Sequence, residues 1–471
     1  MTDLKSSRKG RSFTTPLTVL LGVAIIALIV RLAPLLRDSV GMNPDSGRYI
    51  ELAQGFNHGC GFARWLDGSC RAVETLRTPG YPLFLAAMPN LRTAIAIQGV
   101  VGAAVCLLVG LYVWRCWGLM AGVAAELLVA FDIPSILFGA MIMSDILFQA
   151  LVTTGVVLGL WVIARGRNDR MAIAGIVVAA ILFGVAISVR PLGVVLPIFA
   201  VLPVFLLPRV SWRGTITIAL LAGTIPALVI FGWMARNDRW TGVWILSTDG
   251  PIDLYYYKAA GFVWYRSDKS FRAVEDDLGR DLGWPMRDFT EVPPTLQPEM
   301  IQRTFAIVRN DPGASLIMTL RCLAWLAIVP ERGNLDAYLG TNAGADSYFA
   351  ASGNITERIQ EMLRSPLLTT LIALQFLAIV FVWIGVARAL GTLRHKSARE
   401  RSLILIPLIL TFAFLGLAAG AESIARYRLP VTPMLAVLAA IGWFGRFIVV
   451  DGNSKSGGIQ TAPSPAAVTA D

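Results

Sequence analysis

The chain has 471 residues, of which 55% are hydrophobic and only 15% carry a charge. This composition excludes an ordinary soluble domain and indicates an integral membrane protein. A formal net charge of +10 could suggest nucleic-acid binding, but the lysines and arginines fall almost wholly between apolar runs. We therefore expect a lipid bilayer as the partner of this charge and no nucleic acid.

The first apolar run covers residues 16–36. It matches the roughly 20 residues that cross a bilayer and lacks a small-residue cleavage site, so we expect a retained first helix. It is preceded by the basic residues Lys5, Arg8, Lys9 and Arg11. These charges predict that residues 1–16 form a cytoplasmic tail and that the chain leaves the first helix on the outer side.

Further apolar runs lie near residues 93–114, 118–137, 145–164, 171–188, 191–208, 215–235, 366–388, 402–421 and 429–449. Each can cross about 30 Å of hydrocarbon. Every connection that an even number of spans assigns to the cytoplasm carries Lys or Arg, as the positive-inside rule requires. The sequence predicts an all-α polytopic bundle of about ten transmembrane helices over 17–450, in the plasma (inner) membrane, with both termini cytoplasmic.

The two long outer loops cover residues 37–92 and 236–365. Within the second loop, the apolar segment 315–329 is short and contains Arg321, which favours a helix lying in the membrane interface. The final segment, 451–471, is rich in Gly, Ser, Pro and Ala, so we expect a disordered cytoplasmic tail. No soluble catalytic domain is expected.

Two of the five cysteines, Cys60 and Cys70, share the first outer loop. In an oxidising compartment they could form a disulfide, although two free thiols are an alternative. His58 and His395 are predicted on opposite sides of the membrane, and no spacing indicates a metal cage. We assign no metal ligand and no certain cofactor, and keep a divalent cation as a further option.

The first outer loop contains MNPDSGRYIELAQGF, residues 42–56. Read as a helix from about Asp45, it places Asp45, Tyr49, Leu52 and Phe56 on one face, which should pack towards the spans. Partial burial should raise the pKa of Asp45 unless a cation compensates, which is the environment of a general base. The alternative is that Asp45 only caps the helix.

Other polar residues are predicted at the outer ends of spans. Arg77, later in the first outer loop, precedes a proline-rich turn, where it could bind an anion or only reach towards lipid headgroups. The remaining positions are Asp132, Asp145, Arg190, Glu422, Arg426 and Arg428. Such charges indicate either an ion-pair network or a binding site. Glu126, predicted nearer mid-membrane, could be a protonated core acid or a sign of transport.

Five segments resemble motifs of a known superfamily. They are D-S-G-x-Y-x-x-x-A from Asp45, R-T-P-G-Y-P-L-F-L-A from Arg77, M-S-D-I-L-F from Met143, R-P-L-G from Arg190 and R-Y-R-L-P-V-x-P from Arg426. In this order they resemble the polyprenyl-phosphate-sugar-dependent glycosyltransferases of the GT-C superfamily. The branch that they resemble contains bacterial aminoarabinose transferases, protein O-mannosyltransferases and rhizobial lipopolysaccharide glycosyltransferases.

The resemblance implies that Asp45 is the catalytic base or orients the acceptor. It also implies that basic residues at outer helix ends hold the lipid phosphate, here Arg77, Arg190, Arg426 and Arg428. Tyr49, Tyr81, Asp132, Asp145 and Glu422 are further candidate substrate contacts. The chain departs from the family where Ser46 replaces a second acid and where Asp145 replaces a glutamate.

The function that this implies is membrane glycosyl transfer, with a polyprenyl-phosphate sugar as donor and an envelope glycan, lipid or protein as acceptor. A noncatalytic scaffold for envelope glycan assembly is one alternative, because the second loop holds interface-type aromatic residues. A secondary transporter is the other, although transporter sites lie near mid-membrane and the polar residues here crowd one face.

Overall fold

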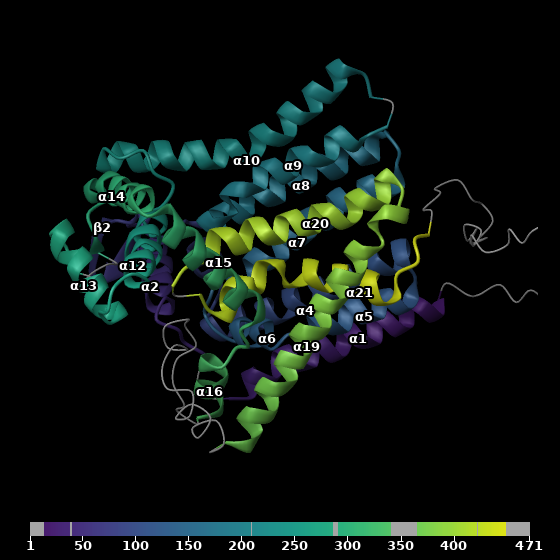
Figure 1. Cartoon of the computed structure of the whole chain (residues 1–471), viewed down its shortest axis with the longest axis horizontal. Coiled ribbons are helices and arrows are strands. Elements are labelled where there is room, and N and C mark those ends of the chain that lie inside the picture. Colours follow the sequence, from purple (N-terminus) through teal and green to yellow (C-terminus); the bar gives the residue numbers. More distant parts are fainter. Residues whose placement is uncertain are drawn as a thin grey trace, which may run out of the picture.

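The computed structural model describes residues 14–37, 40–208, 210–285, 291–340, 365–421 and 423–448. Within these ranges the protein is an all-α bundle with one two-stranded sheet. Long helices run roughly side by side along the bundle, and shorter helices gather at one end, on the left in Figure 1. The predicted all-α polytopic membrane architecture is confirmed.

The long helices follow the apolar runs. They are α1 (Thr14–Leu32), α4 (Leu91–Trp117), α5 (Leu119–Ala130), α7 (Asp145–Arg165), α8 (Arg170–Val189), α10 (Trp212–Thr241), α19 (Pro366–Gly391), α20 (Ala398–Ala418) and α21 (Thr432–Phe444). In the described part of the chain, nine helical segments are long and apolar enough to cross a membrane, or ten if one bent pair forms a single span. Large apolar side chains such as Ile29 and Leu228 point outwards, as lipid-facing residues do.

Two predicted spans are irregular. The run at 118–137 becomes α5 and α6 (Ile133–Gly139), bent by 50°, because Asp132 caps α6 and Pro134 lies in its first turn. The run at 191–208 becomes η2 (Pro191–Val195), α9 (Leu196–Val201) and η3 (Leu202–Leu206). A proline near the start of each piece interrupts the helix. The apolar stretch there, Pro191–Leu206, is therefore shorter and more broken than we predicted, and its crossing of the membrane stays a prediction.

The segment predicted to lie in the interface is also longer than expected. It comprises α15 (Pro312–Ile328) and α16 (Gly333–Leu339). Together, Pro312–Leu339 has the length and composition of a membrane-crossing segment. The interfacial placement of 315–329 therefore stays a prediction.

The helices at the end of the bundle come from both predicted outer loops. The first loop supplies α2 (Ser46–Asn57), the antiparallel hairpin of β1 (Ala63–Leu66) and β2 (Ser69–Val73), and α3 (Gly80–Ala86). The second supplies α11 (Asp249–Ile252), the π-helix η4 (Asp253–Ala259), α12 (Ala260–Trp264), α13 (Phe271–Leu282), η6 (Pro294–Leu296) and α14 (Gln297–Asn310). The remaining short pieces are η1 (Ala33–Leu36), η7 (Leu393–His395) and η8 (Ala425–Val431).

The two outer loops form one unit. Leu76 of the first loop packs into a core with Tyr255, Tyr256 and Val274 of the second. The Ser247 hydroxyl donates a 2.6 Å hydrogen bond to the Leu76 carbonyl oxygen. This contact fixes the second loop against the backbone that carries Arg77. Residues almost 200 positions apart in the sequence can therefore face one site.

A disulfide joins Cys60 and Cys70, whose Cα atoms are 5.6 Å apart. It ties the chain just after α2 to β2. Asp67 and Gly68, both with positive φ, form the turn of the hairpin between the strands. The disulfide thus closes the hairpin that follows α2 in the chain.

Candidate active site at one end of the bundle

Asp45 occupies the position immediately before α2, but its side chain makes no capping hydrogen bond. Instead, Oδ1 accepts a hydrogen bond from Arg77 Nη2 at 2.6 Å, and Oδ2 accepts one from Arg426 Nη1 at 3.0 Å. Tyr49 and Leu52 of α2 are buried, as the helical pattern predicted, and Phe56 is half-buried. The capping alternative for the Asp45 side chain is therefore wrong.

Asp45 is the centre of an alternating series of charges that we call the ion-pair chain. Its members, in order of contact, are Asp249, Arg77, Asp45, Arg426, Asp145 and Arg190. Arg77 Nη1 lies 3.1 Å from Asp249 Oδ2, and Arg426 Nε lies 3.2 Å from both Asp145 oxygens. Arg190 completes the chain by donating to Asp145.

Local structure explains why these side chains converge. Asp145 begins α7, and Arg190 follows α8, which ends where Pro191 enforces a break. Arg426 lies in η8 beside them. The backbone of Arg77 is held by Glu74, whose Oε1 accepts its N–H at 3.2 Å. Helix ends from distant parts of the sequence therefore meet at one level of the bundle.

Glu74 and its partner Arg48 support the site and were not predicted. Glu74 is 3% exposed, and Arg48 Nε lies 2.8 Å from its Oε2. Burial alone would raise the pKa of Glu74, but Arg48 and the N–H groups of Leu76 and Arg77 lower it overall. The sequence signal was only an acid three residues before Arg77, which local spacing cannot distinguish from a surface charge.

The ion-pair chain sets the protonation state of Asp45. Burial would raise its pKa, but the charges of Arg77 and Arg426 outweigh burial and lower the pKa from 3.8 to about 2. Arg77 and Arg426 are therefore the cations that compensate for the burial of Asp45. Asp45 is charged at neutral pH, and it is a weak base as long as both guanidinium groups stay bound to it.

Tyr49 and Tyr81 lie behind the ion-pair chain. Their rings pack edge to face with centroids 4.8 Å apart, and both residues are almost fully buried. The Tyr49 hydroxyl is 3.2 Å from Ser144 Oγ, and the Tyr81 hydroxyl donates to Gln98 at 2.7 Å. The Arg77 guanidinium carbon lies 5.6 Å from the Tyr49 ring centre. These tyrosines therefore position Arg77 and α2 from within the protein.

Two other predicted positions lie outside the ion-pair chain. Asp132 caps α6, where it accepts hydrogen bonds from the Ser135 N–H at 3.0 Å and the Ser135 hydroxyl at 2.6 Å. Arg428 donates to the carbonyl oxygens of Leu326 at 2.8 Å and Val329 at 3.0 Å, which fixes the end of α15. Glu422 lies outside the described residues.

A cavity of about 420 Å³ adjoins the ion-pair chain. Arg190 and Asp249 line this cavity and are also members of the ion-pair chain. Its other polar lining includes Asp253, Tyr257, Lys258 and Tyr427. Most of its wall is apolar and includes Leu192, Val194, Leu246, Leu254 and Leu417. Asp249, Asp253 and Lys258 were not predicted, and their only signal was the helical spacing of acids and a lysine between 249 and 258.

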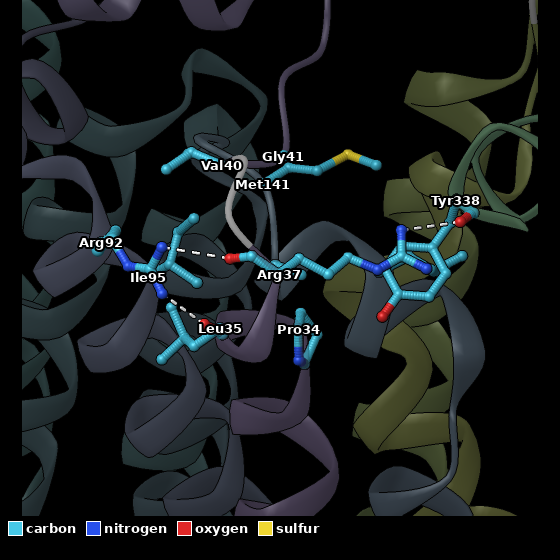
Figure 2. A pocket seen from close by; sticks show the side chains of 11 residues that line it. Pro34, Leu35, Arg37, Val40, Gly41, Arg92, Ile95, Met141 and Tyr338 are labelled. Carbon is cyan, nitrogen blue, oxygen red and sulfur yellow. Dashed lines mark hydrogen bonds between the residues drawn. The ribbon is translucent and has the colours of Figure 1, made fainter. Parts of the chain in front are cut away.

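A separate, smaller pocket of about 70 Å³ lies near the C-terminal end of α1 (Figure 2). Arg37 lies over the ring of Tyr338, 3.6 Å from its centre, and donates to the Tyr338 carbonyl oxygen at 2.8 Å. Arg92 donates to the carbonyl oxygens of Leu35 and Arg37. This pocket shares no lining residue with the cavity beside the ion-pair chain.

Glu126 is fully buried between α5 and α4, where a side chain at Gly110 would collide with it. Neither of its carboxyl oxygens has a hydrogen-bond partner among the described residues. It does not line the cavity beside the ion-pair chain. Over the ranges that the structure describes, no group of three or more His, Cys, Asp or Glu could hold a metal ion.

No protein-family model and no curated protein matches the sequence. The fold is similar to that of oligosaccharyltransferase AglB from Archaeoglobus fulgidus, in complex with an inhibitory peptide and a dolichol-phosphate, with 16% identity and a TM-score of 0.48. That match covers 90% of this chain and 50% of AglB, so the chain spans about half of AglB's length.

A second similar structure is ArnT from Cupriavidus metallidurans bound to undecaprenyl phosphate, with 16% identity, a TM-score of 0.36, and coverage of 92% of this chain and 78% of ArnT. Similarity at this level transfers no activity from one protein to another.

Proposed function

We propose that this protein is a membrane glycosyltransferase that transfers a sugar from a polyprenyl-phosphate donor to a hydroxyl group of an envelope glycan, lipid or protein. The reaction takes place on the extracytoplasmic face of the plasma (inner) membrane, and both termini are cytoplasmic. The observation that supports this proposal is the ion-pair chain around Asp45, which shares Arg190 and Asp249 with a largely apolar cavity.

The cavity and the ion-pair chain together suit an amphiphilic donor. The apolar wall offers a place for isoprenoid units, whose burial is favourable at roughly 25 cal/mol per Å². Arg190 at the cavity and Arg77 and Arg426 next to it supply guanidinium groups for the phosphate. A purely apolar pocket would not orient the phosphate, and a purely charged one would not hold the lipid.

The chemistry requires one carboxylate. The acceptor hydroxyl oxygen attacks the anomeric carbon and forms the new glycosidic bond. The bond from that carbon to the phosphate oxygen breaks, and its electron pair leaves with the polyprenyl phosphate. Asp45 takes the acceptor proton, and the arginines stabilise the charge that develops on the phosphate. Because the phosphate leaves as an anion, no second carboxyl group is needed to protonate it, in contrast to glycoside hydrolysis. A single displacement of this kind inverts the anomeric centre.

The pairing of Asp45 with two arginines gives the donor a second role. A phosphate group that accepts hydrogen bonds from Arg77 or Arg426 competes with Asp45 for the same N–H groups. Loss of an arginine from Asp45 raises its pKa above about 2 and makes it a stronger base. The donor would thereby activate the base that its own transfer requires.

The proposal can be tested by mass spectrometry of envelope glycans and of polyprenyl-phosphate sugars in cells that lack the protein. We expect one sugar residue to be missing from an envelope acceptor and its lipid-linked donor to accumulate. Together these changes identify both substrates. An unchanged glycan profile with unchanged donor pools, in cells that normally make the protein, would contradict the proposal.

A further inference from the structure

Asp253 differs from the other charged residues that line the cavity. Arg190 pairs with Asp145, Asp249 pairs with Arg77, and Lys258 Nζ donates to the Leu417 carbonyl oxygen at 2.5 Å. Among the described residues, none donates a hydrogen bond to the Asp253 carboxyl group or forms an ion pair with it. Asp253 therefore has no direct hydrogen-bond or ion-pair partner in the described part of the chain, although the positive charges of Arg77 and Lys258 act on it from further away.

The surroundings of Asp253 make an uncompensated charge unfavourable. Its side chain is exposed to the cavity, yet protein surrounds the cavity on several sides. Burial and then the charge of Asp249 raise the pKa of Asp253, against the opposing charges of Arg77 and Lys258. The neutral form of the carboxyl group is therefore favoured until hydrogen-bond donors stabilise its charge. Groups that donate hydrogen bonds to the carboxyl oxygens would offset this cost. The cavity therefore favours a ligand with several donors at this point.

The position of Asp253 matches the sugar of the donor better than its phosphate. Asp253 follows Asp249 by one helical turn, which corresponds to about 5.4 Å along a helix axis and is comparable to one sugar ring. Asp249 is bonded to Arg77 of the ion-pair chain, so Asp253 lies one step further from the phosphate-binding arginines. Tyr257, one turn beyond Asp253, and Tyr427 add aromatic surface to the same cavity. Hydroxyl donors and ring faces are what a sugar offers to such a site.

We propose that Asp253 binds the transferred sugar by accepting hydrogen bonds from its hydroxyl groups, and that the negative charge which these hydrogen bonds stabilise on Asp253 disfavours an acidic sugar. This inference rests on the function proposed above. It assigns to this residue the recognition of the sugar, whereas the arginines recognise the phosphate. An acidic sugar would bring a second negative charge next to Asp253 and Asp249, and like charges in a partly desolvated site repel strongly.

The test measures binding to the purified full chain in lipid nanodiscs. The probes are undecaprenyl phosphate without a sugar, undecaprenyl phosphate glucose and undecaprenyl phosphate glucuronate. We expect the wild type to bind the glucose probe at least about 10-fold more tightly than the glucuronate probe, because the glucuronate carboxylate would lie next to the like charges of Asp253 and Asp249. Asp253→Asn should lower the affinity for the glucose probe about 10-fold and reduce the difference in affinity between the glucose and glucuronate probes. It should leave the affinity for undecaprenyl phosphate unchanged.

The matched control is Asp276→Asn, which makes the same change at an exposed acid of α13 in the same outer loop. It should alter none of the three affinities. Unchanged binding of undecaprenyl phosphate by Asp253→Asn also shows that the variant is folded.

If Asp253→Asn does not change the ratio of the affinities for the glucose and glucuronate probes, this inference is overturned while the proposed function stands. An equal loss for all three probes would also overturn it, since Asp253 would then act on the phosphate or on the fold. If Asp253→Asn cannot be purified, a wild type that binds glucose and glucuronate probes equally would overturn the inference without any variant. A wild type that binds none of the probes would overturn both the inference and the proposed function.

Discussion

Replacing Asp145 by Asn should destabilise the protein more than any single surface charge change. The Asp145 side chain is fully buried, and it pairs with both Arg190 and Arg426. At 3.2 Å from Arg426 Nε, Coulomb attraction amounts to about 5 kcal/mol at an effective dielectric constant of about 20. Desolvation offsets part of this attraction, and removing one partner of a buried pair typically costs about 3–5 kcal/mol.

The assay is equilibrium unfolding of the purified protein in mixed detergent micelles. A second variant, Arg190→Gln, and the double variant complete a thermodynamic cycle. Because Asp145→Asn leaves the Arg190 side chain, which is only 15% exposed, without its partner, the double variant should lose less stability than the sum of the single losses, with a coupling of at least about 1 kcal/mol.

The matched control is Asp67→Asn. Asp67 pairs with Arg71 at 2.9 Å, but its side chain is 77% exposed. Its loss should cost no more than about 0.5 kcal/mol, as is usual for surface substitutions. If Asp145→Asn were as mild as Asp67→Asn, or if the two losses in the cycle were strictly additive, the proposed continuity of the ion-pair chain would be refuted.

Two further predictions concern Arg428 and Asp45. Arg428 donates to two backbone carbonyl groups of the 326–329 segment. Arg428→Gln should therefore lower the unfolding midpoint but leave the affinity for undecaprenyl phosphate unchanged. A loss of lipid affinity without a loss of stability would contradict this prediction. The folded-state pKa of Asp45 is lowered to about 2, so its charge contributes stability above its ordinary pKa of 3.8, and that contribution is lost as the pH falls through about 2. The difference in unfolding midpoint between the wild type and Asp45→Asn should therefore be constant between about pH 5 and 8 and shrink below about pH 4; a difference that changes around pH 6 would contradict the lowered pKa.

The transmembrane architecture could be predicted because lipid-spanning helices have a simple requirement: long apolar runs whose backbone groups are satisfied internally. The region 191–208 shows the limit of that rule. Its hydropathy is that of a span, but Pro191, Pro197 and Pro203 each remove a helical hydrogen bond, and the result is three short pieces. Hydropathy alone does not register this interruption.

The ion-pair chain could be predicted only as a set of residues at one membrane level. Which acid meets which arginine depends on contacts between positions up to 381 residues apart. Arg426 and Arg428 illustrate the difficulty, since both are cationic and only two positions apart. In a 3₁₀ helix, with about three residues per turn, two positions correspond to a rotation of roughly 240°. Arg426 therefore reaches Asp45 and Asp145, while Arg428 reaches the end of α15.

The contribution of the second outer loop was the least predictable part. Asp249, Asp253 and Lys258 lie in a segment without a motif, and their role depends on η4 adopting a π-helix beside the outer end of α20. The packing of Tyr255 and Tyr256 on the opposite side of η4 directs Asp253 and Lys258 towards the cavity. Such a geometry follows from tertiary packing and not from local propensity.

The central claim is that Asp45 takes the acceptor's proton during sugar transfer. The most direct measurement is single-turnover transfer from a radiolabelled polyprenyl-phosphate sugar to its acceptor in proteoliposomes, with wild type and Asp45→Asn compared at saturating donor. We expect the wild type to form a covalent product, and Asp45→Asn to bind the donor but to transfer at least about 100-fold more slowly, as is typical when a general base is lost. Transfer by Asp45→Asn at the wild-type rate would contradict the account, as would a wild type that moves the label across the membrane without forming a product.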